Sequence, residues 1–225
     1  MEMEDAELIR SYVKTGSEDA FAELVSRYVD MVYSTASRQV GHAQLAEEVS
    51  QNVFTLLARK APALTQFKSL GGWLHRATCF IAAQTIRAEM RRRQRERLAA
   101  VMNESATDSD CWEQIAPQLD IAINQLSSAD RMAIVARFLQ SKSIREVAGA
   151  LNVSEEAAKK RIARAVEKLH RTLSGRGLAV SSTALATLLL SRAAEAAPHG
   201  LSRIITASAV PGVSTLSLFQ ICVIM

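Results

Sequence analysis

The stretch SIREVAGALNVSEEAAKKRIARAVEKLHR, residues 143–171, restricts the possible folds of this chain more than any other segment. Ser143 is followed three residues later by Glu146, the pattern of a capping box, and Ser154 is a good N-cap for a second helix. Apolar residues recur at helical spacing behind each cap: Ile144, Val147, Ala148 and Leu151, then Ala158, Ile162, Ala165, Val166 and Leu169. The pattern predicts two short helices, joined by a tight turn, whose apolar stripes pack together.

The second of these helices also has a basic face. Opposite its apolar stripe it carries Glu156, Lys160, Arg164 and Glu167, with Lys159 and Arg161 on the flanks. A helix-turn-helix presents its second helix to the major groove of DNA in this way, with flanking cations on phosphates. The alternative is an ordinary solvated helix of a bundle, because Lys and Arg are also common surface residues. We favour DNA binding, because both caps and the short turn agree with it.

Composition and charge point to a helical protein with a polyanionic partner. The 225 residues include only 9 Gly and 4 Pro, and alternating strand patterns are scarce. The net charge of +4 is unevenly spread: residues 87–97, RAEMRRRQRER, hold six arginines, whereas residues 98–118 are acidic. Such asymmetry favours a polyanion as partner for one part of the chain.

Helical periodicity divides the chain into four segments. In the first, residues 1–100, apolar spacing predicts helices over about 19–40, 43–59 and 73–100. Residues 101–118 lack a sustained period and indicate an acidic linker. Residues 119–174 contain the helix-turn-helix, and residues 175–225 form an Ala-, Ser- and Leu-rich tail. We therefore expect an all-α protein: two small helical domains joined by an acidic linker, the second a helix-turn-helix, followed by a tail of uncertain role.

Several classes of protein are disfavoured. Cys79, Cys111 and Cys222 form no C-x-x-C pair, which favours a reducing, cytoplasmic setting without zinc, and the four histidines are scattered. We expect no metal, no cofactor, no catalytic residues and no small-molecule substrate, so an enzyme is the least supported class. The acidic N-terminus excludes a secretory signal, and no uncharged apolar run of 18 residues is present. The apolar tail leaves membrane association open.

Two stretches of the first domain have surfaces of different character. In residues 66–97 an aromatic and a polar loop precede an arginine-rich helix, a combination expected for single-stranded nucleic acid, although Trp73 taken alone is more simply a core residue. In AEEVSQNVFTLLARK, residues 46–60, a polar face opposes an apolar stripe, with Phe54 near its edge. That polar face consists of Glu47, Glu48, Gln51 and Asn52. Without a cation majority it suits a protein partner better than DNA, while a plain solvated surface remains the simpler alternative.

Together these pieces resemble the sigma-70 family of bacterial RNA polymerase sigma factors, in its compact extracytoplasmic-function type. AEEVSQNVF resembles the family's core-binding helix, A-E-D-x-x-Q-x-x-F, with matches at Ala46, Glu47, Gln51 and Phe54 and with Glu48 in place of Asp. GGWLHRATCFIAAQTIRAEMRRR resembles its promoter-melting helix, W-L-x-x-I-A-x-N-x-x-x-D-x-x-R-R. Trp73, Leu74, Arg76 and Arg87 match there, and Phe80 and Gln84 replace Asn and Asp.

Residues 126–171 resemble the family's fourth region. Positions in register are Leu126, Arg131, Glu146, Ala148, Leu151, Ser154, Lys159, Arg161, Arg164 and Ala165, while Ser128 replaces Pro and Ala158 replaces Val. The resemblance extends over about residues 5–173. Three motifs in the family's order are far more specific than any one of them.

The resemblance implies a sigma factor that binds core RNA polymerase and directs promoter-specific transcription initiation. It assigns binding of the −35 element to Arg145, Ser154, Lys159, Lys160, Arg161 and Arg164. It assigns capture and melting of the −10 element to Lys68, Trp73, Arg76, Arg87 and Arg91. It assigns binding of core polymerase to Glu47, Glu48, Gln51 and Phe54. Promoter DNA and core polymerase are the implied partners, and an anti-sigma factor is a further candidate.

Two other readings stay open. A stand-alone helix-turn-helix regulator, not associated with polymerase, accounts for residues 127–172 but leaves the pattern over 46–100 unexplained. An RNA-binding or membrane-peripheral helical protein would use the arginine run and the apolar tail. For the tail we expect either that it folds back on the C-terminal domain or recruits a partner, or that it is a weakly packed appendage.

Overall fold

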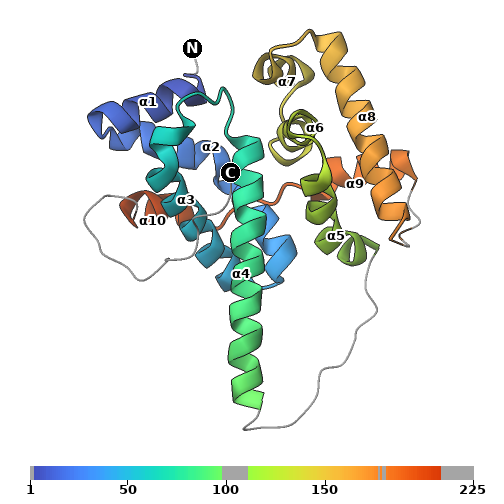
Figure 1. The fold of residues 1–225 in the computed structure, drawn as a ribbon, viewed down its shortest axis with the longest axis horizontal. Helices are drawn as coiled ribbons and strands as arrows, with labels where there is room; N and C mark the ends of the chain where they lie inside the picture. The colour runs from blue at the N-terminus through green and yellow to red at the C-terminus, as the bar shows by residue number, and fades with distance from the viewer. Residues whose placement is uncertain (1–2, 98–110, 177, 179–180, 209–225) are drawn as a thin grey trace.

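The computed structural model describes residues 3–97, 111–176, 178 and 181–208, and all regular elements within them are helices (Figure 1). The all-α fold class is therefore confirmed. The segment expected to form the first domain comprises α1 (Asp5–Thr15), α2 (Glu18–Val40), α3 (Ala43–Leu64) and α4 (Gly71–Arg97). The second comprises α5 (Cys111–Gln125), α6 (Ser128–Ile134), the π-helical η1 (Val135–Leu139), α7 (Ile144–Leu151) and α8 (Glu155–Ser174). The tail contributes α9 (Ser182–Arg192) and α10 (Leu201–Ser208).

In the first domain, α2 is the central helix and packs against α1, α3 and α4. Its ends follow from local chemistry: the Ser17 hydroxyl accepts a hydrogen bond from the Ala20 amide at 3.2 Å, and Gly41 closes the helix at a φ of 63°. The Asp5 carboxylate is buried at the start of α1, where it accepts from Arg27, from the Tyr28 hydroxyl and from the Leu70 amide. One carboxylate thus ties α1, α2 and the loop before α4 together.

Two helix boundaries differ from the sequence-based expectation. α3 continues past residue 59 and through Pro62, because Ala61 and Leu64 are buried in the core and hold the last turn. α5 begins at Cys111, so residues 111–118 are helical and not part of a linker as expected. Ile115 and Leu119 are fully buried and anchor this helix despite its polar neighbours. The remaining linker residues 101–110 lie outside the described residues.

The helix-turn-helix forms as its caps predict. The Ser143–Glu146 capping box is present, and the Ser154 hydroxyl accepts from the Ala157 amide at 3.2 Å. Between the helices, Asn152 takes the left-handed conformation at a φ of 54°, which reverses the chain. Val147 and Ala148 of α7 and Ala158 of α8 are buried together, in a cluster that also includes Ala133 of α6 and Ala136 of η1.

The tail folds back on the molecule within its described part. α9 packs against α8 and η1 on the second domain, as expected, but α10 packs against α2 and α3 on the first domain (Figure 1). Within the described residues, no helix combines the length and the apolar character needed to cross a bilayer. The apolar stretch 216–225 lies outside the described residues.

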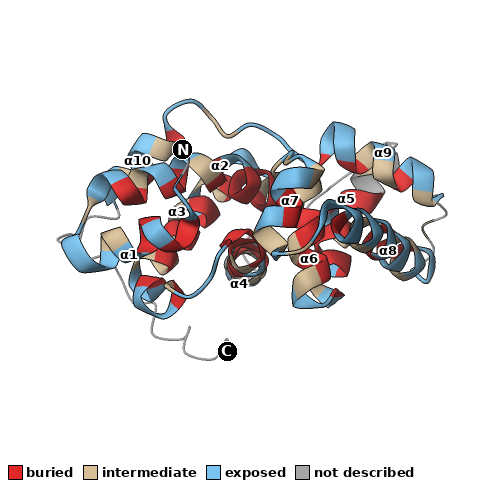
Figure 2. Ribbon diagram, turned by 90° about the horizontal axis from the view of Figure 1, so that it is seen from above, coloured by how far each residue is buried: buried red, intermediate tan, exposed pale blue. Residues whose placement is uncertain are grey.

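The two domains also pack directly on each other. α4 contacts α5, α6 and η1, and α2 contacts α5, so buried residues continue from one domain into the other (Figure 2). Gly71 sits at this junction, where a Cβ atom would lie 2.4 Å from the Gln140 Nε2 atom. The missing side chain therefore allows the start of α4 to approach η1 closely.

Candidate nucleic-acid and polymerase interfaces

The cations of the helix-turn-helix face solvent on the side opposite the buried stripe. Lys159, Lys160 and Arg164 on α8 are exposed and Arg161 is half-buried, while Arg145 on α7 is exposed. Lys159 has a carboxylate nearby, at 4.0 Å from Glu156. The orientation derived from helical periodicity is correct, because Ala158, Ala165 and Leu169 are buried as that periodicity requires.

Two further residues of the fourth-region pattern have structural roles. Ser154 is exposed, but its oxygen already accepts the capping hydrogen bond, which leaves its hydroxyl proton for a phosphate. The buried Arg131 donates to the carbonyl oxygens of Asn124, at 3.1 Å, and Leu126, at 2.9 Å. It satisfies carbonyls at the end of α5 and fixes the entry into α6.

The residues expected at the −10 element lie along one side of α4, with Lys68 exposed in the loop before it. At 100° per residue, Trp73, Arg76, Arg87 and Arg91 fall within an arc of about 60°. The three arginines are exposed, whereas Trp73 is half-buried and packs against the hydrophobic core. In this conformation the indole is therefore a core residue at the margin of an arginine stripe.

The residues expected on the polar face of α3 are less exposed to solvent than expected. Glu48 is exposed and Glu47 and Gln51 are half-buried, but Phe54 is 0% exposed. Its expected position near the edge of the face is wrong, because the ring lies inside the core of the first domain. Phe54 positions α3 and does not offer its ring to a partner in this structure.

A buried polar cluster at the domain junction was missed by the sequence interpretation. His75 and Cys79 lie one turn apart on α4, and the His75 Nε2 atom is 2.9 Å from Oδ1 of Asp120 on α5. Arg38 of α2 donates to both Asp120 oxygens at 3.0 Å, and the Gln39 amide donates to the Cys79 sulfur at 3.0 Å. The His75–Cys79 spacing was the only local signal, since the other members come from distant helices.

Burial disfavours the charged forms of His75 and Asp120, but the charged partners of each group outweigh the effect of burial. The Cys79 sulfur and the Asp120 carboxylate raise the pKa of His75 to about 9. Arg38, followed by His75, lowers the pKa of Asp120 despite its complete burial. The junction is thus held by a charged imidazolium, a carboxylate and a guanidinium.

The same cluster has the donor types of a metal site. Among the described residues, His75, Cys79 and Asp120 bring potential ligand atoms within 4.8 Å of one another. The Arg38 guanidinium occupies both Asp120 oxygens, and its positive charge would repel a cation placed there. An ion-pair network accounts for these contacts better than a metal centre does.

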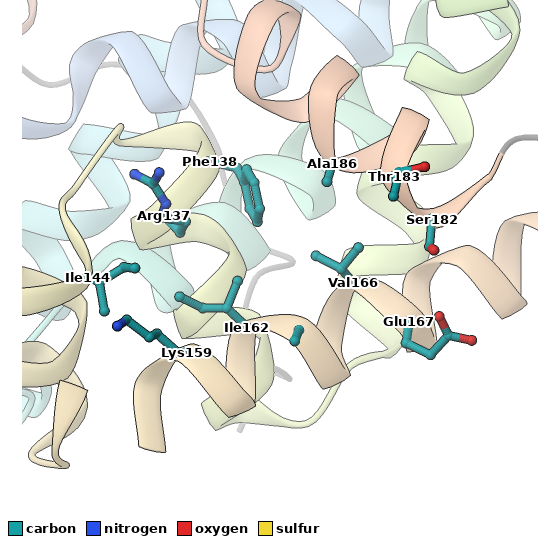
Figure 3. Close-up of a pocket in the computed structure, with 11 residues that line it drawn as sticks. Arg137, Phe138, Ile144, Lys159, Ile162, Val166, Glu167, Ser182, Thr183 and Ala186 are labelled. Carbon is teal, nitrogen blue, oxygen red and sulfur yellow. The ribbon is translucent and has the colours of Figure 1, made fainter. Parts of the chain in front are cut away.

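Beside α8 lies a groove of about 370 Å³ between this helix, η1, α7 and α9 (Figure 3). Phe138, Ile162, Val166 and Ala186 line it, with Arg137 and Lys159 toward one end. The groove follows the apolar edge of α8, not its exposed basic face.

Residues 117–169 match region 4 of the sigma-70 family. SigW of Bacillus subtilis, an extracytoplasmic-function (ECF) RNA polymerase sigma factor, is 25% identical over 173 residues, which cover 72% of this chain and 92% of SigW. Residues 117–169 thus match a sigma-70 region 4, and the chain is similar to an ECF sigma factor over most of its length.

Two other ECF sigma factors are similar to this chain over a comparable length. BldN of Streptomyces coelicolor is 29% identical over 166 residues, which cover 71% of this chain and 62% of BldN. SigM of Mycobacterium tuberculosis is 26% identical over 174 residues, which cover 76% of this chain and 86% of SigM. The likeness therefore reaches well beyond the helix-turn-helix and into the first domain.

Proposed function

We propose that this protein is a sigma factor that binds core RNA polymerase and directs promoter-specific transcription initiation. The observation that carries the proposal is the match of residues 117–169 to region 4, since it includes the helix whose exposed side is basic. The relatives, all named as RNA polymerase sigma factors, support the same function. This function requires no catalytic residue in the chain.

The second domain is the reader of the −35 element. Lys160 and Arg164 point away from the packed stripe, so they can enter or border the major groove without disturbing the fold. Phosphates on either side can be contacted by Lys159, Arg161, Arg145 and Ser154, the N-cap residue of α8. The proposed contacts thus divide into base-reading residues at the centre and positioning residues at the margin.

The first domain captures the −10 element along the arginine stripe of α4. Arg76, Arg87 and Arg91, with Lys68 in the preceding loop, can follow a single-strand backbone. Melting extrudes a base at a cost of a few kcal/mol, and contacts to the displaced strand can offset that cost. Trp73 would have to leave part of its core packing to stack on such a base.

Core polymerase binds the polar side of α3 through Glu47, Glu48 and Gln51. These residues support a protein contact because they are polar, at least partly accessible and not cationic. Phe54 contributes indirectly, by holding α3 in place from the core.

The test of this proposal is capture of core polymerase by the tagged full-length protein. Purified core polymerase is expected to elute with the protein as a stoichiometric complex. DNA binding by the protein without any capture of core polymerase would instead indicate a stand-alone helix-turn-helix regulator. Retention of a Glu48→Lys variant at lower occupancy would locate the contact on α3.

A further inference from the structure

The closed packing of the two domains conflicts with reading both promoter elements at once. Elements at −35 and −10 lie about 25 base pairs apart, which is about 85 Å of duplex at ~3.4 Å per base pair. The two packed domains span residues 5–97 and 111–174. With radii of gyration of ~12 Å and ~11 Å, their centres are only about 30 Å apart. The domains must separate before initiation, so the contacts that hold them together control activity.

The tail attaches to both domains. On α9, Leu185 and Leu189 are fully buried against the second domain. On α10, Leu201 is 2% exposed and Ile205 is 1% exposed, and the helix packs on α2 and α3 of the first domain. The segment between the two helices crosses from one domain to the other (Figure 1). The described tail is therefore a single strap with an apolar anchor at each end.

The crossing segment is bonded to the domain junction itself. The Ala197 amide donates to Asp30 of α2 at 2.9 Å, and the Ala193 carbonyl accepts from the Arg38 Nη1 atom at 2.6 Å. Arg38 is the residue that also holds both oxygens of Asp120 on α5. One guanidinium therefore joins the tail, the first domain and the second domain, and release of the tail removes one of its partners.

The strap also passes the surface proposed for core polymerase. α10 lies against α3, and Glu195 of the strap and Glu47 of α3 both act on Tyr33, where, after burial, their charges raise the pKa of the phenol. Glu47 belongs to the polar side of α3. A partner that approaches α3 from this side meets the tail.

We propose that residues 181–208 form an intramolecular strap that holds the two DNA-binding domains closed and competes with core RNA polymerase for the α2–α3 surface. The competition rests on the proposed function, whereas the closure is a property of the chain alone. Polymerase binding and strap release are then coupled, and each favours the other.

The chain offers a matched pair of residues for the test. Ile205 is 1% exposed on α10, whereas its neighbour Ile204 is 54% exposed. Ile205→Asp should expel α10 from the first domain, and Ile204→Asp should leave it in place. Truncation after Ser174 removes the strap entirely and serves as the second variant. Fluorophores on Lys60→Cys and Arg171→Cys, in full-length protein with Cys111→Ser and Cys222→Ser, report the separation of the domains by energy transfer.

The strap predicts longer separations in Ile205→Asp and in the truncated protein, and a gain of about tenfold or more in affinity for core polymerase. The parent and Ile204→Asp should stay closed. Equal separations in all four proteins would overturn the strap. Longer separations without polymerase binding by any of the proteins would uphold the strap and overturn the sigma-factor function.

Discussion

His75 on α4 and Asp120 on α5 share a buried hydrogen bond of 2.9 Å that joins the two domains of this protein. Arg38 on α2 also donates to Asp120 and to the Ala193 carbonyl of the tail. His75, Asp120 and Arg38 together therefore connect the two domains and the tail. In a junction made of buried charges, each charge is stabilised by the others. Removal of one side chain therefore leaves the remaining charges buried and unpaired, which destabilises the junction.

The closed form is expected to depend on pH through His75. Its pKa is raised from 6.5 to about 9 by Cys79 and Asp120, against the effect of burial. His75 therefore stabilises the closed form fully below about pH 6.5, and this contribution is lost as the pH rises through about 9. Energy transfer between the two domain labels should fall over that range.

The control for this prediction is His75→Gln, which keeps a polar side chain without a titrating imidazole. Its domain separation should vary little between pH 6.5 and pH 9. If parent and His75→Gln follow the same curve, the pH response does not arise from His75.

Arg164→Ala and Lys160→Ala are expected to weaken promoter binding without unfolding the second domain, since both side chains are exposed. Loss of a phosphate contact should lower the salt slope of binding by about one, whereas loss of a base contact should relax sequence preference. Binding isotherms at several salt concentrations separate the two cases. Lys14→Ala, an exposed cation on α1, is the control. Unchanged binding in both α8 variants would refute the groove-facing orientation of this helix.

Glu48→Ala combined with Gln51→Ala is expected to reduce affinity for core polymerase at unchanged thermal stability, because neither side chain is part of the buried core. Lys60→Ala, exposed at the far end of α3, should have no effect. Titration of labelled polymerase measures the difference. An affinity equal to that of the parent would move the polymerase contact away from this face.

Phe54→Ala should behave in the opposite way. Its ring is 0% exposed, so truncation should lower the free energy of unfolding by about 3–5 kcal/mol. Urea denaturation of the full-length protein measures this loss. A fully stable Phe54→Ala variant with weakened polymerase binding would instead show that the Phe54 ring contacts polymerase.

Asp5→Ala is expected to destabilise the first domain. The carboxylate accepts from Arg27 at 2.8 Å and from the Leu70 amide at 2.9 Å, and its removal leaves a partly buried guanidinium and a buried amide without it. The cost should be about 3–5 kcal/mol, as for other buried ion pairs that lose one partner. Asp19→Ala, an exposed acid in the first turn of α2, provides the comparison in thermal unfolding. Equal midpoints for the two variants would contradict the role given to Asp5.

Sequence patterns correctly predicted those structural features that depend on neighbouring residues in the chain. The caps at Ser143 and Ser154, the helical fold class and the outward direction of Lys160 and Arg164 all depend on residues within a few positions of one another. These features required no knowledge of the tertiary structure.

The structural features that the sequence interpretation missed depend on packing between residues far apart in the chain. α5 starts early because Ile115 and Leu119 find a core to enter, and Phe54 turns inward because several helices enclose α3. The partners Arg38 and Asp120 are 82 positions apart, a separation at which no periodicity indicates contact. The docking of α10 on the first domain is of the same kind, because α10 packs on α2 and α3, which lie more than 130 positions earlier in the chain.

The most direct test of the central claim is transcription by purified core polymerase on a library of genomic DNA fragments. With this protein added, we predict transcripts that start downstream of a shared pair of −35 and −10 sequences, and loss of these transcripts with Lys160→Ala and Arg164→Ala combined. Transcripts that are the same with and without the protein would contradict the claim that it directs promoter-specific initiation.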